Sequence, residues 1–183
     1  MAQPPFQQDG FRCLGAIIAG GKSRRFGSDK ALAIVDGRPM LDHVAAGLAA
    51  QVDAMVICGK EWRAWPMLAD YPVADFGPLG GLCAALDHAA RAGYHAVLTA
   101  PVDVMPLPDD LLPLLAGETA AVFARQHLIG FWPVGYRDGL VAHILSGGGK
   151  AFRAWLDSTD VRRVDEPMPM VNVNRREDLP RAS

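Results

Sequence analysis

Apolar segments of two kinds alternate along the chain, and polar or glycine-rich turns separate them. Short runs rich in β-branched residues predict buried strands, whereas longer alanine- and leucine-rich stretches predict helices with one apolar face. The predicted strands cover residues 14–19, 54–58, 71–74, 94–100, 120–124, 129–136 and 161–164, and the predicted helices cover residues 39–50, 82–91, 139–145 and 152–156. This alternation, without repeats or a long linker, predicts one α/β domain.

The first predicted strand breaks into a long loop that is rich in glycine and positive charge. The loop contains Gly20, Gly21, Lys22, Arg24, Arg25 and Lys30. Glycine lets the backbone close around an anion and leaves N–H donors exposed, while the cations offset the charge of the anion. We therefore expect a polyphosphate site. The alternative is an ordinary strand-to-helix loop with solvated basic residues, although such loops are usually only ~2–6 residues long.

Two better-known phosphate-binding loops do not fit this segment. A P-loop ending in Gly21-Lys22-Ser23 requires glycine at position 16, where the chain has Ala16. A Rossmann fingerprint that begins at Gly20 requires glycine at the positions of Lys22 and Arg25. The sequence therefore predicts a phosphate loop of a different kind.

An aspartate follows the strand predicted at residues 94–100, in the segment Pro101-Val102-Asp103. Acidic residues at the carboxyl end of a buried strand in an open α/β sheet lie where ligands bind. A carboxylate suits Mg²⁺, which takes one or two protein carboxylates and completes its shell with water and phosphate oxygens. Asp103 is thus the predicted metal ligand. The alternative is that it caps the helix that begins near Pro108, although Asp109 and Asp110 lie closer to that helix.

Two further glycine-rich turns are candidate anion sites. Residues 77–81, Gly-Pro-Leu-Gly-Gly, precede a predicted helix, and Pro78 and the glycines leave N–H groups free to point at an anion. The alternative is that these glycines only allow close packing at the helix start. Residues 146–150 end in Lys150 and form either a second anion site or a simple helix connection, which we favour.

The composition argues against several classes of function. Half of the 183 residues are hydrophobic, which is enough for a sizeable core, and the net charge of -2 gives no global positive field, so we expect neither a nucleic-acid nor a membrane partner. Cys13, Cys58 and Cys83 are far apart, which argues against a disulfide framework or a zinc site and fits a reducing cytoplasm. Residues 1–12 are predicted to be a flexible N-terminal leader, and residues 13–183 the single domain.

The glycine-rich loop resembles a known signature. The order Ala19-Gly20-Gly21, Arg24-Arg25-Phe26-Gly27 and Asp29-Lys30 is similar to that of nucleotidyltransferases with a glycosyltransferase-A-like fold, and most of all to the molybdenum cofactor guanylyltransferase family. Residues 77–81, 101–103 and the carboxyl-terminal Val-Asn-Val-Asn of residues 171–174 also occur in the family's order. The chain departs from the family at Val102, where cysteine is common, and at Leu128, where proline often follows the histidine.

The resemblance implies a fold, a reaction and its partners. The fold would be a single-domain Rossmann-like three-layer sandwich with a mostly parallel central sheet. The reaction would transfer GMP from GTP to the terminal phosphate of molybdenum-molybdopterin, with Mg²⁺ as cofactor, in the cytoplasm, and a molybdoenzyme chaperone or apo-enzyme would receive the product. The alternatives are a molybdopterin cytidylyltransferase, another small NTP transferase and a non-catalytic nucleotide-binding module.

The resemblance also implies roles for particular residues. Lys30 and Asp103 would be catalytic, and Asp103 would hold the metal. The nucleotide would contact Ile18, Ala19, Gly20, Gly21, Arg24, Arg25, Lys30, Asp75 and Asp103. The acceptor would contact Gly80, Gly81, Asn172 and Asn174. A helix cap is an adequate alternative for Asn174, but it does not account for Asn172.

Overall fold

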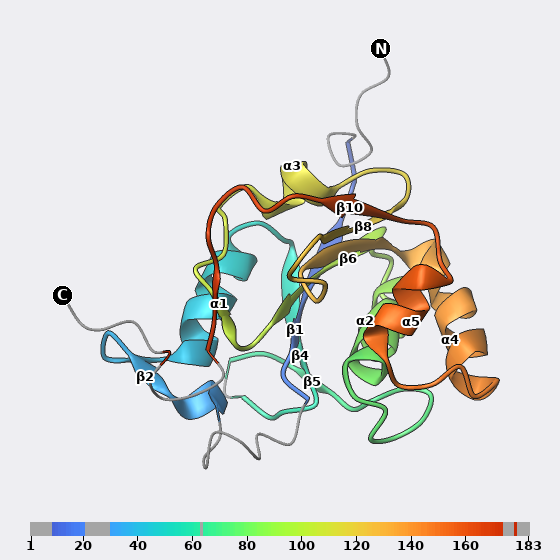
Figure 1. Ribbon diagram of the computed structural model, residues 1–183, viewed down its shortest axis with the longest axis horizontal. Helices are drawn as coiled ribbons and strands as arrows, with labels where there is room; N and C mark the ends of the chain where they lie inside the picture. Colours follow the sequence, from blue (N-terminus) through green and yellow to red (C-terminus); the bar gives the residue numbers. More distant parts are fainter. Residues whose placement is uncertain (1–8, 21–29, 63, 174–177, 179–183) are drawn as a thin grey trace.

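The computed structural model describes residues 9–20, 30–62, 64–173 and 178, with the backbone alone for Lys30. Its centre is a seven-stranded sheet in the order β10-β8-β9-β6-β1-β4-β5 (Figure 1). In chain order these strands are β1 (Cys13–Ile18), β4 (Ala54–Cys58), β5 (Met67–Leu68), β6 (Ala96–Pro101), β8 (Ala120–Phe123), β9 (Gly130–Pro133) and β10 (Val161–Val164).

Most neighbouring strands of this sheet are parallel. β1 pairs in parallel with β4 and β6, β4 with β5, and β8 with β10, whereas β9 runs antiparallel to β6 and β8. A short connection suffices between β8 and β9 because they are antiparallel, while the parallel pairs β1–β4 and β1–β6 need crossovers that contain helices. The predicted strand at residues 129–136 is confirmed, but it ends at Pro133, and residues 134–136 form the 3₁₀ helix η3 (Val134–Tyr136).

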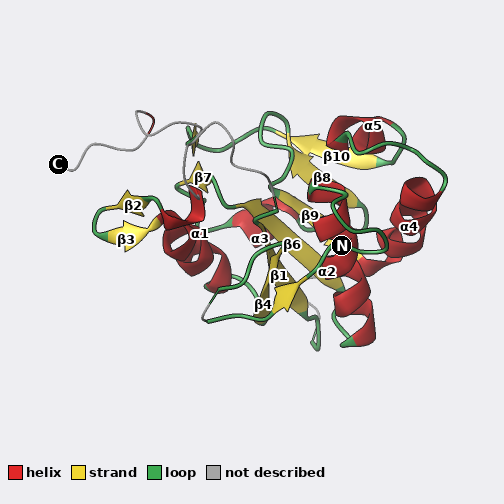
Figure 2. Cartoon of the chain, turned by 90° about the horizontal axis from the view of Figure 1, so that it is seen from below, coloured by secondary structure: helices red, strands yellow, loops and turns green. Residues whose placement is uncertain are grey.

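Helices cover both faces of the sheet, so the molecule has three layers (Figures 1 and 2). The helices α1 (Met40–Ala49) and α3 (Leu111–Leu115) pack on one face, and α2 (Pro78–Arg91), α4 (Arg137–Leu145) and α5 (Phe152–Asp157) pack on the other. A hydrophobic core lies on each face of the sheet, and β1 contributes side chains to both. Cys13 and Ile17 point to the α1 side, and Leu14, Ala16 and Ile18 point to the α2 side. The predicted α/β sandwich with a mostly parallel sheet is confirmed.

Two short ladders lie outside the main sheet. β2 (Ile34–Val35) and β3 (Arg38–Pro39) form a hairpin directly before the start of α1 (Figure 2). The 3₁₀ helix η2 (Lys30–Leu32) precedes this hairpin. β7 (Val104–Met105), directly after β6, pairs antiparallel with β11 (Val171–Asn172). The second ladder therefore brings the carboxyl-terminal segment to the end of a central strand.

One predicted strand is wrong. Residues 71–74 form bends and a turn, and the edge strand is instead Met67–Leu68. The N–H groups of Ile57 and Gly59 donate to carbonyl oxygens at residues 66 and 68, at 2.9 and 2.8 Å, so the free edge of β4 is already paired before residue 71. Pro72 has no N–H group to continue such a ladder.

The boundaries of two other predicted segments also differ. Helix α2 begins at Pro78, earlier than the predicted start at residue 82, because proline is well suited to the first turn of a helix. At the end of the predicted leader, the Phe11 ring stacks on those of His95 and Phe131, with centroids 5.6 and 6.5 Å apart. No helix in the described part of the chain is both long and apolar enough to cross a membrane.

Candidate functional site

The carboxyl ends of three central strands meet at one edge of the sheet. Ile18 of β1 lies beside Cys58 of β4 on one side and Pro101 of β6 on the other. The residues that follow, including Gly20, Gly59 and Asp103, therefore come out at the same edge. In open α/β sheets this edge is where ligands bind.

Gly20 and Gly59 are in close backbone contact at this edge. The Ala19 N–H donates to the Cys58 carbonyl oxygen at 3.0 Å, which draws the two strand ends together. A Cβ atom on Gly59 would lie 2.7 Å from the Gly20 Cα, and Gly59 has a φ of +82°. Only glycine fits both the space and the backbone conformation at position 59.

A cavity of about 850 Å³ opens beside these glycines. Its lining includes Gly20, Gly59, Met67, Asp70, Asp75 and Lys150. Of the residues predicted to bind a nucleotide, Gly20 and Asp75 line it. The volume lies within the usual range of small-molecule sites, ~300–1,000 Å³.

Asp70 is the half-buried carboxylate of this cavity. Its Oδ2 accepts a hydrogen bond from the Gly77 N–H at 3.2 Å, which fixes the side chain against the start of α2. Burial raises the pKa of Asp70, and the negative charge of Asp75 adds to the rise, while the Gly77 N–H and the Lys150 cation oppose it. A carboxylate with a raised pKa in a cavity is a candidate functional group.

Asp75 occupies a different environment. It is exposed, and its backbone has a φ of +56°, which is uncommon for a residue other than glycine. Its backbone carbonyl oxygen, rather than its carboxylate, makes the closest contact, because it accepts a hydrogen bond from Lys150 Nζ at 2.6 Å. Its expected contact with a nucleotide stays a prediction.

Lys150 brings a positive charge into the cavity from a distant part of the chain. It lies between α4 and α5, and Nζ sits 5.4 Å from the centroid of the Phe76 ring. The turn at residues 146–150 is therefore more than a helix connection, because it closes one wall of the cavity and places a cation near Asp70.

Gly80 and Gly81 lie buried in the first turn of α2, where they allow close packing. A Cβ on Gly80 would lie 2.7 Å from the Asp70 Cγ, and one on Gly81 would lie 3.0 Å from the Cys58 Cβ. Burial raises the pKa of the Cys58 thiol to about 12, so this thiol is neutral and acts as packing. The predicted contacts of Gly80 and Gly81 with an acceptor stay predictions.

Asp103 and Asn172 are brought together by the small ladder of β7 and β11. Asn172 is paired with Val104, and the Val173 N–H donates to the Asp103 carbonyl oxygen at 2.8 Å. Asp103 is half-buried in the turn that follows β6. Two candidate residues that are far apart in the sequence therefore meet at the edge of the sheet where β6 ends.

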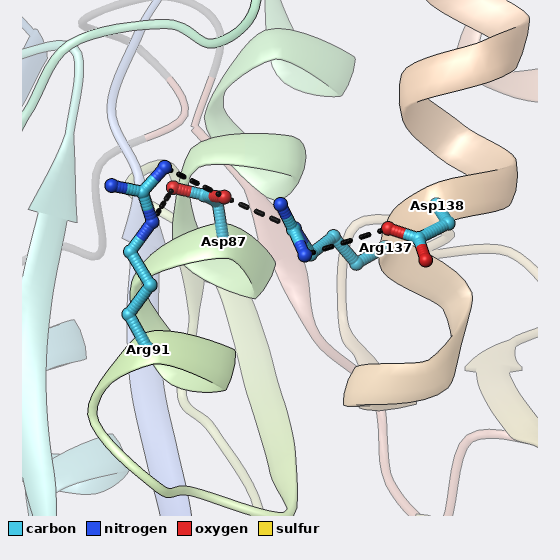
Figure 3. A network of polar contacts seen from close by, with 4 residues as sticks. All are labelled: Asp87, Arg91, Arg137 and Asp138. Atoms are coloured by element: carbon cyan, nitrogen blue, oxygen red, sulfur yellow. Dashed lines mark hydrogen bonds and ion pairs between the residues drawn. The ribbon is translucent and has the colours of Figure 1, made fainter.

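A charged network ties α2 to α4 (Figure 3). The side chain of Asp87, only 12% exposed, forms ion pairs with Arg91 Nε at 2.9 Å and with Arg137 Nε at 3.0 Å. Arg137 also approaches the exposed Asp138 at 3.5 Å. Burial lowers the pKa of Arg137, but Asp87 and Asp138 outweigh it and raise that pKa. The network fixes α2, whose first turn packs on Asp70.

The remaining predicted residues fall into two groups. Ile18 is buried in the core and Ala19 is half-buried, so both contribute to the edge mainly through their backbone. Gly21, Arg24, Arg25 and Asn174, together with the Lys30 side chain, lie outside the described residues.

Sequence reasoning missed Asp70 and Gly59, and it did not assign Lys150 to this site. The signal for Asp70 was present, because an acidic residue that follows a strand marks the ligand edge. With the strand predicted at residues 71–74, that rule selected Asp75, whereas the observed strand β5 ends just before Asp70. Gly59 directly follows β4, and Gly20 follows β1 in a similar way. The position after a central strand, which selected Gly20, therefore also marked Gly59.

The chain is similar to known proteins over nearly its whole length. A MobA-like NTP transferase domain matches residues 15–165. The chain is 36% identical to a molybdenum cofactor guanylyltransferase of Acidiphilium cryptum, over 98% of this chain and 96% of the relative. It is 38% identical to a molybdenum cofactor guanylyltransferase of Cereibacter sphaeroides, over 93% of this chain and 95% of the relative.

Solved structures share the fold at lower identity. A molybdopterin-guanine dinucleotide biosynthesis protein A from Archaeoglobus fulgidus matches with a TM-score of 0.67 and 18% identity, covering 84% of this chain and 83% of that one. A nucleotidyl transferase from Methanothermobacter matches with a TM-score of 0.69 and 16% identity, covering 92% and 94%. From the domain match and the identity to its relatives, the chain belongs to the MobA-like NTP transferase family, a family of nucleotidyltransferases.

Proposed function

We propose that this protein transfers GMP from GTP to the terminal phosphate of molybdenum-molybdopterin, releasing pyrophosphate and forming the molybdopterin guanine dinucleotide. The observation that carries the proposal is the match, over nearly the full length of both chains, to relatives named molybdenum cofactor guanylyltransferase. The cavity at the carboxyl edge of the sheet supports it, because it combines glycine backbone, a carboxylate and a cation in a space large enough for a nucleotide.

The chemistry is an in-line attack of the acceptor phosphate on the α-phosphate of GTP. The attacking oxygen is already an anion, so no strong general base is needed. The barrier lies in bringing anions together and in stabilising the charge on the leaving pyrophosphate, and positioned cations and N–H groups supply both.

We assign the donor nucleotide to the cavity. Gly20 and Gly59 allow its close approach to the backbone, and Asp70 accepts hydrogen bonds from it in the role that the sequence suggested for Asp75. Lys150, which lines the same cavity, offsets phosphate charge. Lys30, Arg24 and Arg25, with the backbone of Gly21, are proposed to bind the triphosphate from the glycine-rich loop.

Asp103 is the proposed ligand of Mg²⁺. No group of three or more His, Cys, Asp or Glu side chains able to hold a metal occurs among the described residues. One carboxylate at the ligand edge fits Mg²⁺, since this ion takes most of its shell from water and phosphate oxygens. The ion would neutralise phosphate charge when bound.

The acceptor is proposed to lie on the other side of Asp103, along β11. Asn172 lies beside Asp103 there, and Asn174 follows two residues later. Gly80 and Gly81, the other two residues predicted to contact the acceptor, lie instead in the first turn of α2 against Asp70 and Cys58, so their contact with an acceptor stays a prediction. We expect the reaction in the cytoplasm, since the three cysteines are free and buried, and we expect a molybdoenzyme chaperone or apo-enzyme to receive the product.

The test is mass spectrometry of the products formed from purified protein, Mg²⁺, molybdenum-loaded molybdopterin and equal amounts of GTP, CTP, ATP and UTP. A guanine dinucleotide as the main product is the expected result. A cytosine dinucleotide would identify a cytidylyltransferase instead. GTP binding without any product would favour another acceptor or a non-catalytic module.

A further inference from the structure

A second pocket adjoins the nucleotide cavity. Five residues line it, and we call it the tryptophan pocket: Leu32, Glu61, Trp62, Trp65 and Met67. Its volume is about 580 Å³. Met67 lines both this pocket and the nucleotide cavity, so the two spaces meet at β5. Met67 and Leu32 remain 43% and 55% exposed, which is high for large apolar side chains beside a site.

The two tryptophans are fixed in place. Trp62 and Trp65 form an antiparallel β-bridge, so their side chains point to the same side of the chain. Both indoles are half-buried against the α1 side of the core. Trp62 Nε1 donates a hydrogen bond to Asp42 Oδ1 of α1 at 2.8 Å, which sets the orientation of that ring. A fixed aromatic surface therefore lines the tryptophan pocket, next to the nucleotide cavity.

Glu61 adds one polar group of defined chemistry to this apolar pocket. It is exposed, and when ionised its carboxylate only accepts hydrogen bonds. Two carboxylate oxygens side by side match a ring edge that presents two adjacent N–H donors. A flat ring that stacks on an indole satisfies the rest of the lining.

We propose that the tryptophan pocket binds a ring with the 2-amino-4-oxo-pyrimidine edge, with Glu61 accepting from its ring N–H and its amino group. Adenine and cytosine present an amino group next to an acceptor nitrogen, and uracil presents one N–H between two carbonyl oxygens. Neither pattern lets a carboxylate make two hydrogen bonds. The pocket therefore selects guanine or a pterin. For the source of that ring, the proposal rests on the proposed function.

The first arm of the test concerns guanine. Calorimetry would compare the binding of GTP with that of ITP, whose base lacks the 2-amino group but keeps the ring N–H. The wild-type protein is expected to bind GTP about tenfold or more tightly, since a hydrogen bond to a charged group is lost with ITP. Glu61→Ala is expected to remove most of this preference. Glu118→Ala, which removes an exposed carboxylate before β8, is the matched control and should keep it.

The second arm concerns the pterin of molybdopterin. If the pocket binds this ring, Glu61→Ala weakens molybdopterin binding by a similar factor and leaves the ratio of GTP to ITP affinity unchanged. Either arm supports the proposal and names the source of the ring. A Glu61→Ala variant with wild-type binding of all three compounds would overturn it.

A tryptophan variant tests the stacking part separately. Trp65→Leu keeps apolar bulk but removes the flat ring, and it should weaken binding of the same compound about fivefold or more, with partial recovery in Trp65→Phe. Unchanged affinity in Trp65→Leu would refute the stacking. These measurements need no turnover, so a protein that shows the Glu61-dependent preference yet makes no dinucleotide would disprove the proposed function and leave the pocket standing.

Discussion

At the scale of single residues, the site depends on which carboxylate the local backbone turns inward. Asp70 and Asp75 both line the cavity, but only the Asp70 carboxylate is held by an N–H donor, that of Gly77. Gly80 makes this possible, because any larger residue would collide with Asp70. Gly80, which the sequence suggested for acceptor binding, therefore also leaves the space that the Asp70 side chain occupies.

Asp70→Asn tests this distinction. The amide keeps the shape and can still accept from the Gly77 N–H, but it loses the charge and one acceptor. We expect turnover to fall by about 10²-fold or more, the usual cost of losing one preorganised polar group. Asp75→Asn is the matched control, and its turnover should change much less; equal losses in both variants would contradict the assignment.

Lys30 and Asp103 carry the proposed charge stabilisation. Lys30→Ala and Asp103→Ala are each expected to reduce turnover by ~10²–10³-fold. Far-ultraviolet circular dichroism and urea midpoints should stay close to wild type. Asp109→Ala, which removes an exposed carboxylate before α3, serves as the control. Near wild-type turnover in either test variant would show that its proposed role is wrong.

Gly59→Ala tests the close contact between strand ends. A comparison with Gly37 separates the cost of the backbone conformation from the cost of the steric contact. Gly59 faces the Gly20 backbone, whereas Gly37 in the β2–β3 hairpin has a φ of +76° and open space around it. The left-handed conformation alone costs about 1–2 kcal/mol. Gly37→Ala should show this loss in urea denaturation, and Gly59→Ala a larger loss together with weaker GTP binding. Equal losses would mean that the contact is relieved by a small shift.

At the scale of elements, α2 is the helix that links the site to the rest of the fold. Its first turn packs on Asp70 and Cys58, and its middle is anchored to α4 through Asp87 and Arg137. The sequence indicated both helices, α2 from its apolar face and α4 as a helix over residues 139–145. It gave no indication of the ion pair, because residues 87 and 137 meet only once the two helices pack side by side.

Asp87→Ala should loosen this packing. The change removes the carboxylate that accepts hydrogen bonds from Arg91 and Arg137, while both arginines keep partial access to water, so we expect a loss of about 1–2 kcal/mol in unfolding free energy. Asp138→Ala removes a carboxylate that is 87% exposed from the same network and should have little effect. A similar stability for both variants in urea denaturation would contradict the anchoring role.

At the scale of the whole molecule, two carboxylates contribute to stability with opposite dependence on pH. Asp70 has a raised pKa, so its contribution to stability is present below the pKa of the unfolded chain and is lost as pH rises through the folded value. Glu166 is the opposite case. Burial raises the pKa of Glu166, but the N–H groups of Arg125 and Gln126 and the Arg125 guanidinium outweigh it, so its pKa is lowered.

These opposite pKa shifts predict different pH profiles of stability for two variants. Asp70→Asn should be more stable than wild type at neutral pH, with the difference disappearing in acid below the ordinary pKa of 3.8. Glu166→Gln should be less stable at neutral pH, and its difference from wild type should vanish as pH falls through the lowered folded pKa. Urea midpoints between pH 3 and pH 8 measure both. Parallel profiles for the three proteins would refute the assignments.

The sequence by itself determined the layered α/β architecture. Apolar periodicity is a local property, and it located the central strands and most helices because buried strands and amphipathic helices have different spacings. It also indicated a candidate ligand edge, since Gly20 and Asp103 each lie two residues after the end of a central strand. The order of motifs indicated the family that the comparisons confirm.

Only the tertiary structure decided which residues share the site. Lys150 reaches Asp75 across 75 positions in the sequence, and Asn172 meets the end of β6 through the short ladder with β7. The edge strand was misplaced because a two-residue strand has almost no periodicity, and its pairing is set by the free N–H groups of β4. Strand pairing and helix packing bring distant residues together, and those contacts leave no local pattern in the chain.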